Sequence, residues 1–158
     1  MPSLPALGPR GEGWVILQLV LFGLIALAGS LGPAWNGALR TVTSAAGATA
    51  IVAGGFLAMR GIIDLRENLT PLPHPRAQSR LIEQGAYRFV RHPIYGGLIF
   101  AAAGWGLWTA SPAALAMTLV LLGFFDLKSR REEHWLEARH PDYAGYRSRT
   151  KRFFPLVY

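Results

Sequence analysis

Residues Tyr95 to Leu127, YGGLIFAAAGWGLWTASPAALAMTLVLLGFFDL, are almost continuously apolar over 33 residues. The main interruption is the segment Thr109–Pro112 near the middle. One helix of this length would rise about 50 Å, which far exceeds the roughly 30 Å hydrocarbon core of a bilayer. The stretch therefore predicts two antiparallel membrane helices, about 95–109 and 112–127, joined by a tight Ser-Pro turn and each slightly short for a full span.

Two further apolar stretches precede this hairpin. Residues 14–31 contain only Gln18 and Ser30 as polar members, and they lack the positive start and small-residue cleavage site of a signal peptide. Residues 43–63 are rich in Ala and Gly, which is typical of a membrane helix that packs closely against other helices. We therefore predict about four transmembrane helices in all.

The composition agrees with an all-α polytopic membrane protein. Hydrophobic residues make up 51% of the 158 residues and charged residues 16%, and the length suits a single domain over residues 1–158. The chain has no Cys, and its four His residues do not form the H-x-x-x-H spacing of a helical metal site. We therefore expect no metal centre.

The net charge of +7 is concentrated in two segments. Fourteen of the sixteen Lys and Arg residues lie in 60–92 and 126–158, and each segment keeps an excess of +3 after its acids are counted. Cations confined to alternate loops of a hydrophobic chain follow the positive-inside rule, which argues against a nucleic-acid partner. We expect an integral protein of a bacterial inner membrane, with both termini cytoplasmic and cytosolic catalytic segments at 64–94 and 128–158.

The third predicted span is preceded by Arg91-His92-Pro93-Ile94-Tyr95-Gly96. Pro93 suits the first turn of a helix, whose N-terminus carries a partial positive charge, with Arg91 and His92 just outside it. This arrangement suits the binding of a carboxylate. The same residues could instead anchor the chain at the membrane interface, and the hexapeptide alone does not decide between the two.

A second polar cluster, Lys128-Ser129-Arg130-Arg131-Glu132-Glu133, follows the fourth predicted span. Taken alone, its i,i+4 pairs are typical of a salt-bridged surface helix. The hairpin, however, returns this cluster to the membrane face at which Arg91–Tyr95 begins. Cations, a His, an aromatic ring and carboxylates then meet at one depth, which predicts a cytosol-facing pocket able to hold an amino-acid zwitterion. The polar 64–92 connector, with its closely spaced prolines and a turn at Gly85, would complete that pocket.

The ordered motifs resemble the isoprenylcysteine carboxyl methyltransferase-like family of integral membrane methyltransferases, which includes relatives acting on phospholipid amines. The resemblance covers residues 64–158, whereas the first two spans match only in hydrophobicity. The residues that carry it are Asn68-Leu69-Thr70-Pro71-x-Pro73, Leu81-Ile82-x-x-Gly85-x-Tyr87-Arg88-x-Val90-Arg91-His92-Pro93-Ile94-Tyr95-x-Gly97, Glu132-Glu133-x-x-Leu136, Tyr143-x-x-Tyr146 and Arg152-Phe153-x-Pro155.

The resemblance implies S-adenosylmethionine as the cofactor. His92 and Tyr95, within the Arg91–Tyr95 motif that includes Pro93, would hold its methionine portion, and Gly85 and Tyr87 would lie near its adenosine. Glu133 would accept from its ammonium group or polarise the nucleophile. The family often carries Arg where Lys128 stands, and Lys keeps the charge without the bidentate fork. Whether Gly96 or Gly97 is the motif glycine is open.

The methyl acceptor is expected to be amphiphilic, either the carboxylate of a prenylcysteine-like compound or a lipid amine. Lys128 or Arg130 would orient a carboxylate, and Glu133 would serve an amine. The acceptor would enter sideways from the lipid between the second and third spans, along a third span thinned by glycines. Two other functions stay open: an NADPH-dependent reductase of the steroid-reductase-like membrane class, and a non-enzymatic membrane protein. The oligomeric state is also open.

Overall fold

The computed structural model describes residues 7–72, 74 and 80–155. These residues form five α-helices and two 3₁₀ helices, with one isolated backbone bridge between Val90 and Lys151. The helices are α1 (Glu12–Leu31), α2 (Ala38–Leu65), η1 (Arg66–Asn68), η2 (Gly85–Arg88), α3 (Pro93–Trp108), α4 (Pro112–Arg139) and α5 (Tyr143–Arg149). The all-α prediction is therefore confirmed for the part of the chain that the structure describes.

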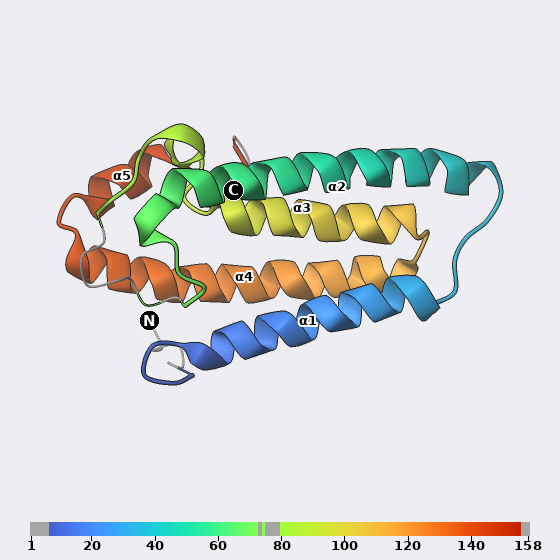
Figure 1. Ribbon diagram of the computed structural model, residues 1–158, viewed down its shortest axis with the longest axis horizontal. Helices are drawn as coiled ribbons and strands as arrows, with labels where there is room; N and C mark the ends of the chain where they lie inside the picture. The colour runs from blue at the N-terminus through green and yellow to red at the C-terminus, as the bar shows by residue number, and fades with distance from the viewer. Residues whose placement is uncertain (1–6, 73, 75–79, 156–158) are drawn as a thin grey trace.

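The four long helices lie side by side and alternate in direction (Figure 1). Helices α1, α4 and α2 with its η1 extension are long and apolar enough to cross a membrane. Helix α3 has 16 residues and rises only about 24 Å, so it is shorter than the hydrocarbon core. Helix α5 and the segment around η2 lie together at one end of the bundle (Figure 1).

The predicted hairpin is formed by α3 and α4. Ser111 caps α4 by accepting a hydrogen bond from the Ala114 amide at 3.2 Å, and Pro112 occupies the first turn. The Ser111 hydroxyl also donates to the Ala28 carbonyl of α1 at 2.8 Å. The turn between α3 and α4 is therefore fastened to the end of α1.

Helix α4 is longer than the fourth span that the sequence predicts. It continues from the apolar stretch through the charged cluster to Arg139 without a break, over a length of about 42 Å. Residues 126–139 are mostly good helix formers, and Arg130 pairs with Asp126 one turn before it at 2.7 Å. One rigid helix thus carries Lys128, Glu132 and Glu133 out of the apolar region.

Glycines bring α2 and α3 into backbone contact. A Cβ added to Gly54 would lie 2.5 Å from the Gly97 carbonyl oxygen, and one added to Gly97 would lie 2.5 Å from the Gly54 carbonyl oxygen. Gly47 and Gly104 meet in the same way one heptad away. Such close approach is the usual role of small residues in membrane helices. The expected lipid route between the second and third spans is therefore closed, because these glycines pack against backbone.

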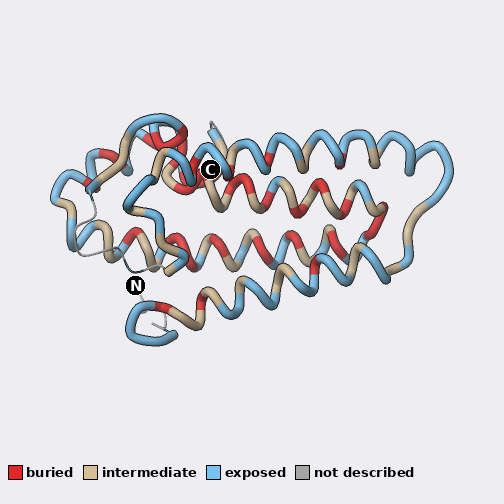
Figure 2. The backbone as a smooth tube through the Cα atoms, viewed as in Figure 1, coloured by how far each residue is buried: buried red, intermediate tan, exposed pale blue. Residues whose placement is uncertain are grey.

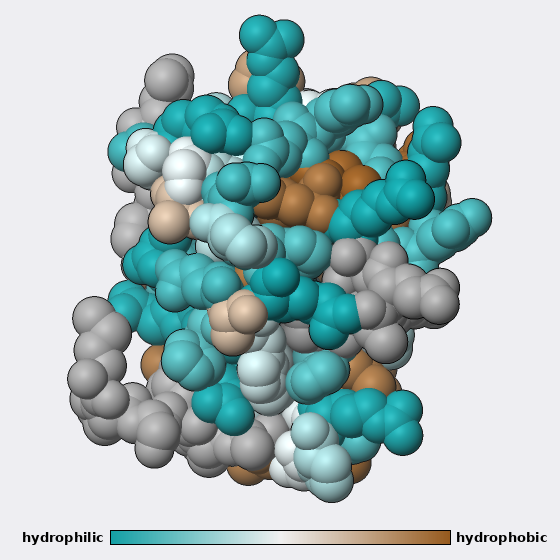
Figure 3. Space-filling view, turned by 90° about the vertical axis from the view of Figure 1, so that its left-hand side faces the viewer, coloured by the Kyte–Doolittle hydropathy of each residue, from teal (hydrophilic) through white to brown (hydrophobic). Residues whose placement is uncertain are grey.

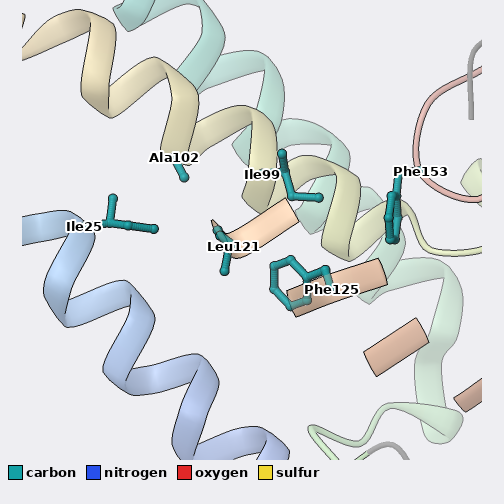
Figure 4. Packing of buried hydrophobic residues seen from close by; sticks show 6 residues of the cluster. All are labelled: Ile25, Ile99, Ala102, Leu121, Phe125 and Phe153. Atoms are coloured by element: carbon teal, nitrogen blue, oxygen red, sulfur yellow. The ribbon is translucent and has the colours of Figure 1, made fainter. Parts of the chain in front are cut away.

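The core lies where α1, α3, α4 and the C-terminal segment meet. Its buried cluster consists of Ile25, Ile99, Ala102, Leu121, Phe125 and Phe153 (Figure 4). Buried positions are concentrated on α3 and α4, whereas α1 and α2 are largely exposed (Figure 2). Large apolar side chains such as Val52 and Phe56 are 73% exposed on α2. An apolar exterior around a packed interior is what a lipid environment requires, and the protein is an integral membrane protein.

Candidate functional site

A cavity of about 330 Å³ lies at the end of the bundle where the charged residues gather. This end of the molecule is covered mainly by hydrophilic side chains (Figure 3). The apolar wall of the cavity comes chiefly from the end of α2 and the connector. Its polar lining comes from four α-helices and from the connector with η2, and it includes Gln18, Arg80, Tyr87, Arg91, His92, Tyr95, Lys128, Glu132, Tyr143 and Tyr146.

The Arg91–His92 pair is fixed by the C-terminal segment. The Arg91 amide donates to the Lys151 carbonyl at 2.8 Å, and the His92 amide donates to the Arg152 carbonyl at 2.9 Å. The Arg91 guanidinium reaches the same segment by donating to the carbonyls of Arg147, at 3.2 Å, and Thr150. Hydrogen bonds thus link the C-terminal segment to the residues that immediately precede α3, which begins at Pro93 and lies more than fifty positions earlier in the sequence.

Glu133 is the centre of a buried ionic cluster. Its Oε1 accepts from Arg91 Nε at 2.9 Å, from His92 Nε2 at 3.1 Å and from Arg152 Nε at 3.3 Å. Burial by itself would raise the pKa of this carboxyl, but the hydrogen bonds and charges of His92 and Arg91 hold its pKa well below the usual range. The residue is 2% exposed and is not among the described residues that line the cavity.

The neighbouring Glu132, and not the predicted Glu133, lines the cavity. Its side chain is 27% exposed, lines the cavity and accepts a hydrogen bond from the Tyr95 hydroxyl at 2.9 Å. Successive helical residues point about 100° apart, so one glutamate of the pair faces the cavity and the other faces the C-terminal segment. The sequence motif contains both residues but does not reveal the rotation of the helix.

Aromatic rings form the floor of the site. Tyr95 stacks on His92 with ring centroids 5.3 Å apart, and on Phe125 with centroids 4.5 Å apart. Lys128 Nζ lies 5.2 Å from the Tyr95 ring centroid, within cation–π range. The ring of Tyr95 is therefore held rigidly, with its hydroxyl directed to Glu132.

Lys128 and Arg130, both predicted to act on the substrate, have different surroundings. Lys128 is 1% exposed, and its Nζ donates to Gln18 Oε1 at 2.6 Å and to the Pro71 carbonyl at 3.4 Å. The side chain of Arg130 is 48% exposed, pairs with Asp126 and does not line the cavity. The geometry thus brings Lys128, but not Arg130, to the cavity.

The connector docks on the end of α2 through Gly85. Asp64 Oδ2 accepts from the Ala86 amide at 2.7 Å, and Gly85 has a φ of +60° with Asp64 where a Cβ would lie. Only glycine fits this position without strain. Gly85 thereby places Tyr87 in the cavity wall without lining the cavity itself.

Helix α5 contributes two tyrosines to which the sequence assigns no role. Tyr146 donates to the Tyr87 carbonyl at 2.7 Å, while the buried hydroxyl of Tyr143 has no hydrogen-bond partner among the described residues. Burial keeps the pKa of both hydroxyls above the usual range, so both stay protonated. Their spacing in the Tyr143-x-x-Tyr146 motif was the sequence signal that both face the same side, because residues three positions apart lie on one face of a helix.

The fold and the site define a polytopic helical membrane protein with an ionisable cavity at one end of its bundle. Residues 42–143 match the family model described as phospholipid methyltransferase. Because this match covers more than half of the chain, the chain belongs to the phospholipid methyltransferase family, and the methyltransferase resemblance seen in the sequence is confirmed.

Similar individual proteins include one that is described as a methyltransferase and one that is described as a metal-resistance protein. The chain is 30% identical over 115 residues to protein-S-isoprenylcysteine O-methyltransferase B of Arabidopsis thaliana, covering 70% of this chain and 58% of that protein. It is 36% identical over 86 residues to the cobalt-zinc-cadmium resistance protein CzcN of Cupriavidus metallidurans, covering 52% and 38% of the two chains. It thus spans about half the length of the curated relatives it matches.

A solved structure extends the likeness of fold to nearly the whole chain. The eukaryotic intramembrane Ras methyltransferase ICMT superposes with a TM-score of 0.69 at 20% identity, over 95% of this chain and 55% of that one. Helix α1, which precedes the region matched by the family model, therefore belongs to the shared architecture.

Proposed function

We propose that this protein is an S-adenosylmethionine-dependent methyltransferase that acts on an amphiphilic acceptor at the cytosolic face of the membrane. The observation that carries the proposal is the cavity itself, in which the Glu132 carboxylate, the Lys128 ammonium and the Tyr95 ring line one volume beside an apolar wall. Membership of a methyltransferase family supports the reaction type.

The cavity residues fit three of the chemical groups of the cofactor, namely its ammonium, its sulfonium and its adenosine. Glu132 has oxygen lone pairs beyond the one bonded to Tyr95 and would hold the ammonium of the methionine portion. The faces of Tyr87 and Tyr95 would stabilise a sulfonium by cation–π contact. The apolar wall, which includes Ile62, Leu65, Leu69, Leu81 and Ile82, would hold the adenosine.

The bound cofactor would supply an activated methyl group, so the protein needs mainly to orient and enclose the reactants. The rigid stack of His92, Tyr95 and Phe125 keeps the cavity floor in place. A carboxylate acceptor attacks without losing a proton, whereas an ammonium acceptor must first give one up. Lys128 would orient the former, and Glu132 would take a proton from the latter.

The tail of the acceptor has a second space available. A groove of about 300 Å³ between α1 and α3 is lined entirely by apolar residues. Leu98 of α3 lines both this groove and the polar cavity, so the two spaces meet at that side chain. We propose that the acceptor enters between α1 and α3, with its tail in the groove and its head in the cavity.

We further propose that the cavity faces the cytoplasm of a bacterial cell. The two segments that build the cavity carry +3 each, whereas the loop at the other end, around Asn36, holds one charge. A reporter enzyme that works only outside the cytoplasm should be active when it is fused at Asn36. A cytoplasmic Asn36 reporter would contradict this orientation.

Cofactor binding is tested by thermal unfolding of the purified protein in detergent. S-adenosylhomocysteine at a hundred times its dissociation constant should stabilise the protein by about 2.7 kcal/mol, while NADPH should have no effect. Glu132→Gln should weaken binding about tenfold or more, because it removes the charge opposite the ammonium. Stabilisation by NADPH alone would favour a reductase, and no response to either compound would favour a non-enzymatic membrane protein.

A further inference from the structure

The buried Lys128 ammonium makes its direct contacts with neutral groups. These are the Gln18 amide oxygen at 2.6 Å, the Pro71 carbonyl at 3.4 Å and the face of Tyr95, while the carboxylate of Glu132, which lines the same cavity, acts on the ammonium from farther away. An ammonium has three N–H donors, so one remains for a ligand in the cavity. A cation placed in this way favours an anionic ligand group, because an anion would remove the cost of burying the charge.

Gln18 can supply a second donor beside this ammonium. Because Lys128 donates to Oε1, the amide orientation is determined, and the NH2 group of Gln18 is left with no hydrogen bond to a described residue. Gln18 lines the cavity together with Lys128. A polar amide in an otherwise apolar membrane helix costs free energy unless its groups are hydrogen-bonded, and such residues often mark functional sites.

The position of Gln18 on α1 connects the polar cavity to the apolar groove. Phe22, Ile25 and Ala26, the α1 residues of the groove, lie four, seven and eight positions after Gln18. Residues at these spacings share one face of a helix. One face of α1 therefore presents an amide to the cavity and apolar side chains to the groove, which matches the head and tail of an amphiphile.

We propose that Gln18 and Lys128 together form a two-donor site for the carboxylate of the acceptor, so that Gln18 determines specificity for carboxylates over amines. This inference rests on the proposed function, since it assigns the acceptor class of the same cavity. A lysine alone offers a point charge without the planar fork of arginine. The Gln18 amide provides the second contact from α1, a helix outside the region that the family model matches.

The test compares the binding of N-acetyl-S-farnesylcysteine, its methyl ester and S-farnesylcysteamine in detergent. The wild-type protein should bind the acid at least tenfold more tightly than the ester. Gln18→Met keeps the length of the side chain and should remove most of that discrimination while leaving ester binding unchanged. Gln18→Glu should pair with Lys128, weaken acid binding further and strengthen binding of the amine. Gln84→Met, an exposed position outside the cavity lining, should behave as wild type.

Affinity for S-adenosylhomocysteine should be the same in wild type, Gln18→Met and Gln84→Met, which carry the same charge, and this separates the two proposals. A protein that binds S-adenosylhomocysteine but does not distinguish acid from ester, or retains the distinction in Gln18→Met, would overturn this inference alone. Absence of S-adenosylhomocysteine binding would overturn the proposed function. Even then, a preference for the acid over the ester that is lost in Gln18→Met but kept in Gln84→Met would establish the carboxylate site.

Discussion

Glu133→Ala should lower the free energy of unfolding by about 3–5 kcal/mol, the range observed when one partner of a buried ionic cluster is removed. Glu133 accepts hydrogen bonds from Arg91, His92 and Arg152 and is 2% exposed. Its loss leaves buried cations without their shared anion, and the contact between the C-terminal segment and the start of α3 weakens with it. The effect should be measured by denaturant unfolding in detergent micelles without any ligand.

Glu132→Ala is the matched control. The Glu132 side chain is partly exposed and accepts a hydrogen bond from the Tyr95 hydroxyl, so its loss should cost only about 1 kcal/mol of stability. It should nevertheless abolish most cofactor binding. Equal stability losses in the two variants would contradict the separate roles assigned to these neighbouring glutamates.

The pH dependence of the Glu133 effect has a definite sign. A carboxyl whose folded-state pKa is depressed contributes its full stabilisation above its unfolded-state pKa of about 4.3. That contribution is lost as the pH falls through the lower pKa of the folded state. The stability difference between wild type and Glu133→Ala should therefore be present at neutral pH and should narrow as the pH falls below about 4.

Hydrophobic patterning was sufficient to predict the helical hairpin, because its length and its Ser-Pro turn are properties of local sequence. It placed the end of the fourth membrane segment at residue 127, where hydrophobicity ends, whereas α4 continues to Arg139 because helix propensity does not end there. Apolarity reports the boundary of the membrane and is a poor guide to the end of a helix.

The site was predictable only in part for a similar reason. Chain order and the hairpin brought Arg91, His92 and Lys128 to one face, as the structure also does. Which of Glu132 and Glu133 faces the cavity depends on the rotation of α4 against its neighbours, and the contribution of Gln18 depends on how α1 packs. Neither rotation is encoded in a motif, since both arise from contacts between residues far apart in the sequence.

The second large effect is expected at the contact between α2 and α3. Gly54→Ala should lower the free energy of unfolding by about 2–3 kcal/mol, because the added Cβ would lie 2.5 Å from the Gly97 carbonyl oxygen and the helices must separate. The adjacent Gly55 provides the control, since a Cβ there meets no atom within 4 Å. Gly55→Ala should be neutral or stabilise by up to about 1 kcal/mol through helix propensity. Unfolding of both variants in detergent would measure the difference, and equal effects would contradict backbone contact at this position.

The same contact decides between the two possible acceptor routes. If the tail of the acceptor passed between α2 and α3, the main effect of Gly54→Ala would be a higher KM for a prenylated acceptor, with little loss of stability. The tight packing there indicates instead that the main effect is a loss of stability, and that the acceptor enters between α1 and α3.

Ala26 is exposed on α1 and lines the groove between α1 and α3, so Ala26→Phe should raise the KM for the acceptor about tenfold. The stability of the protein and its affinity for S-adenosylhomocysteine should stay unchanged. An unaltered KM in Ala26→Phe would exclude the groove as the place where the tail binds.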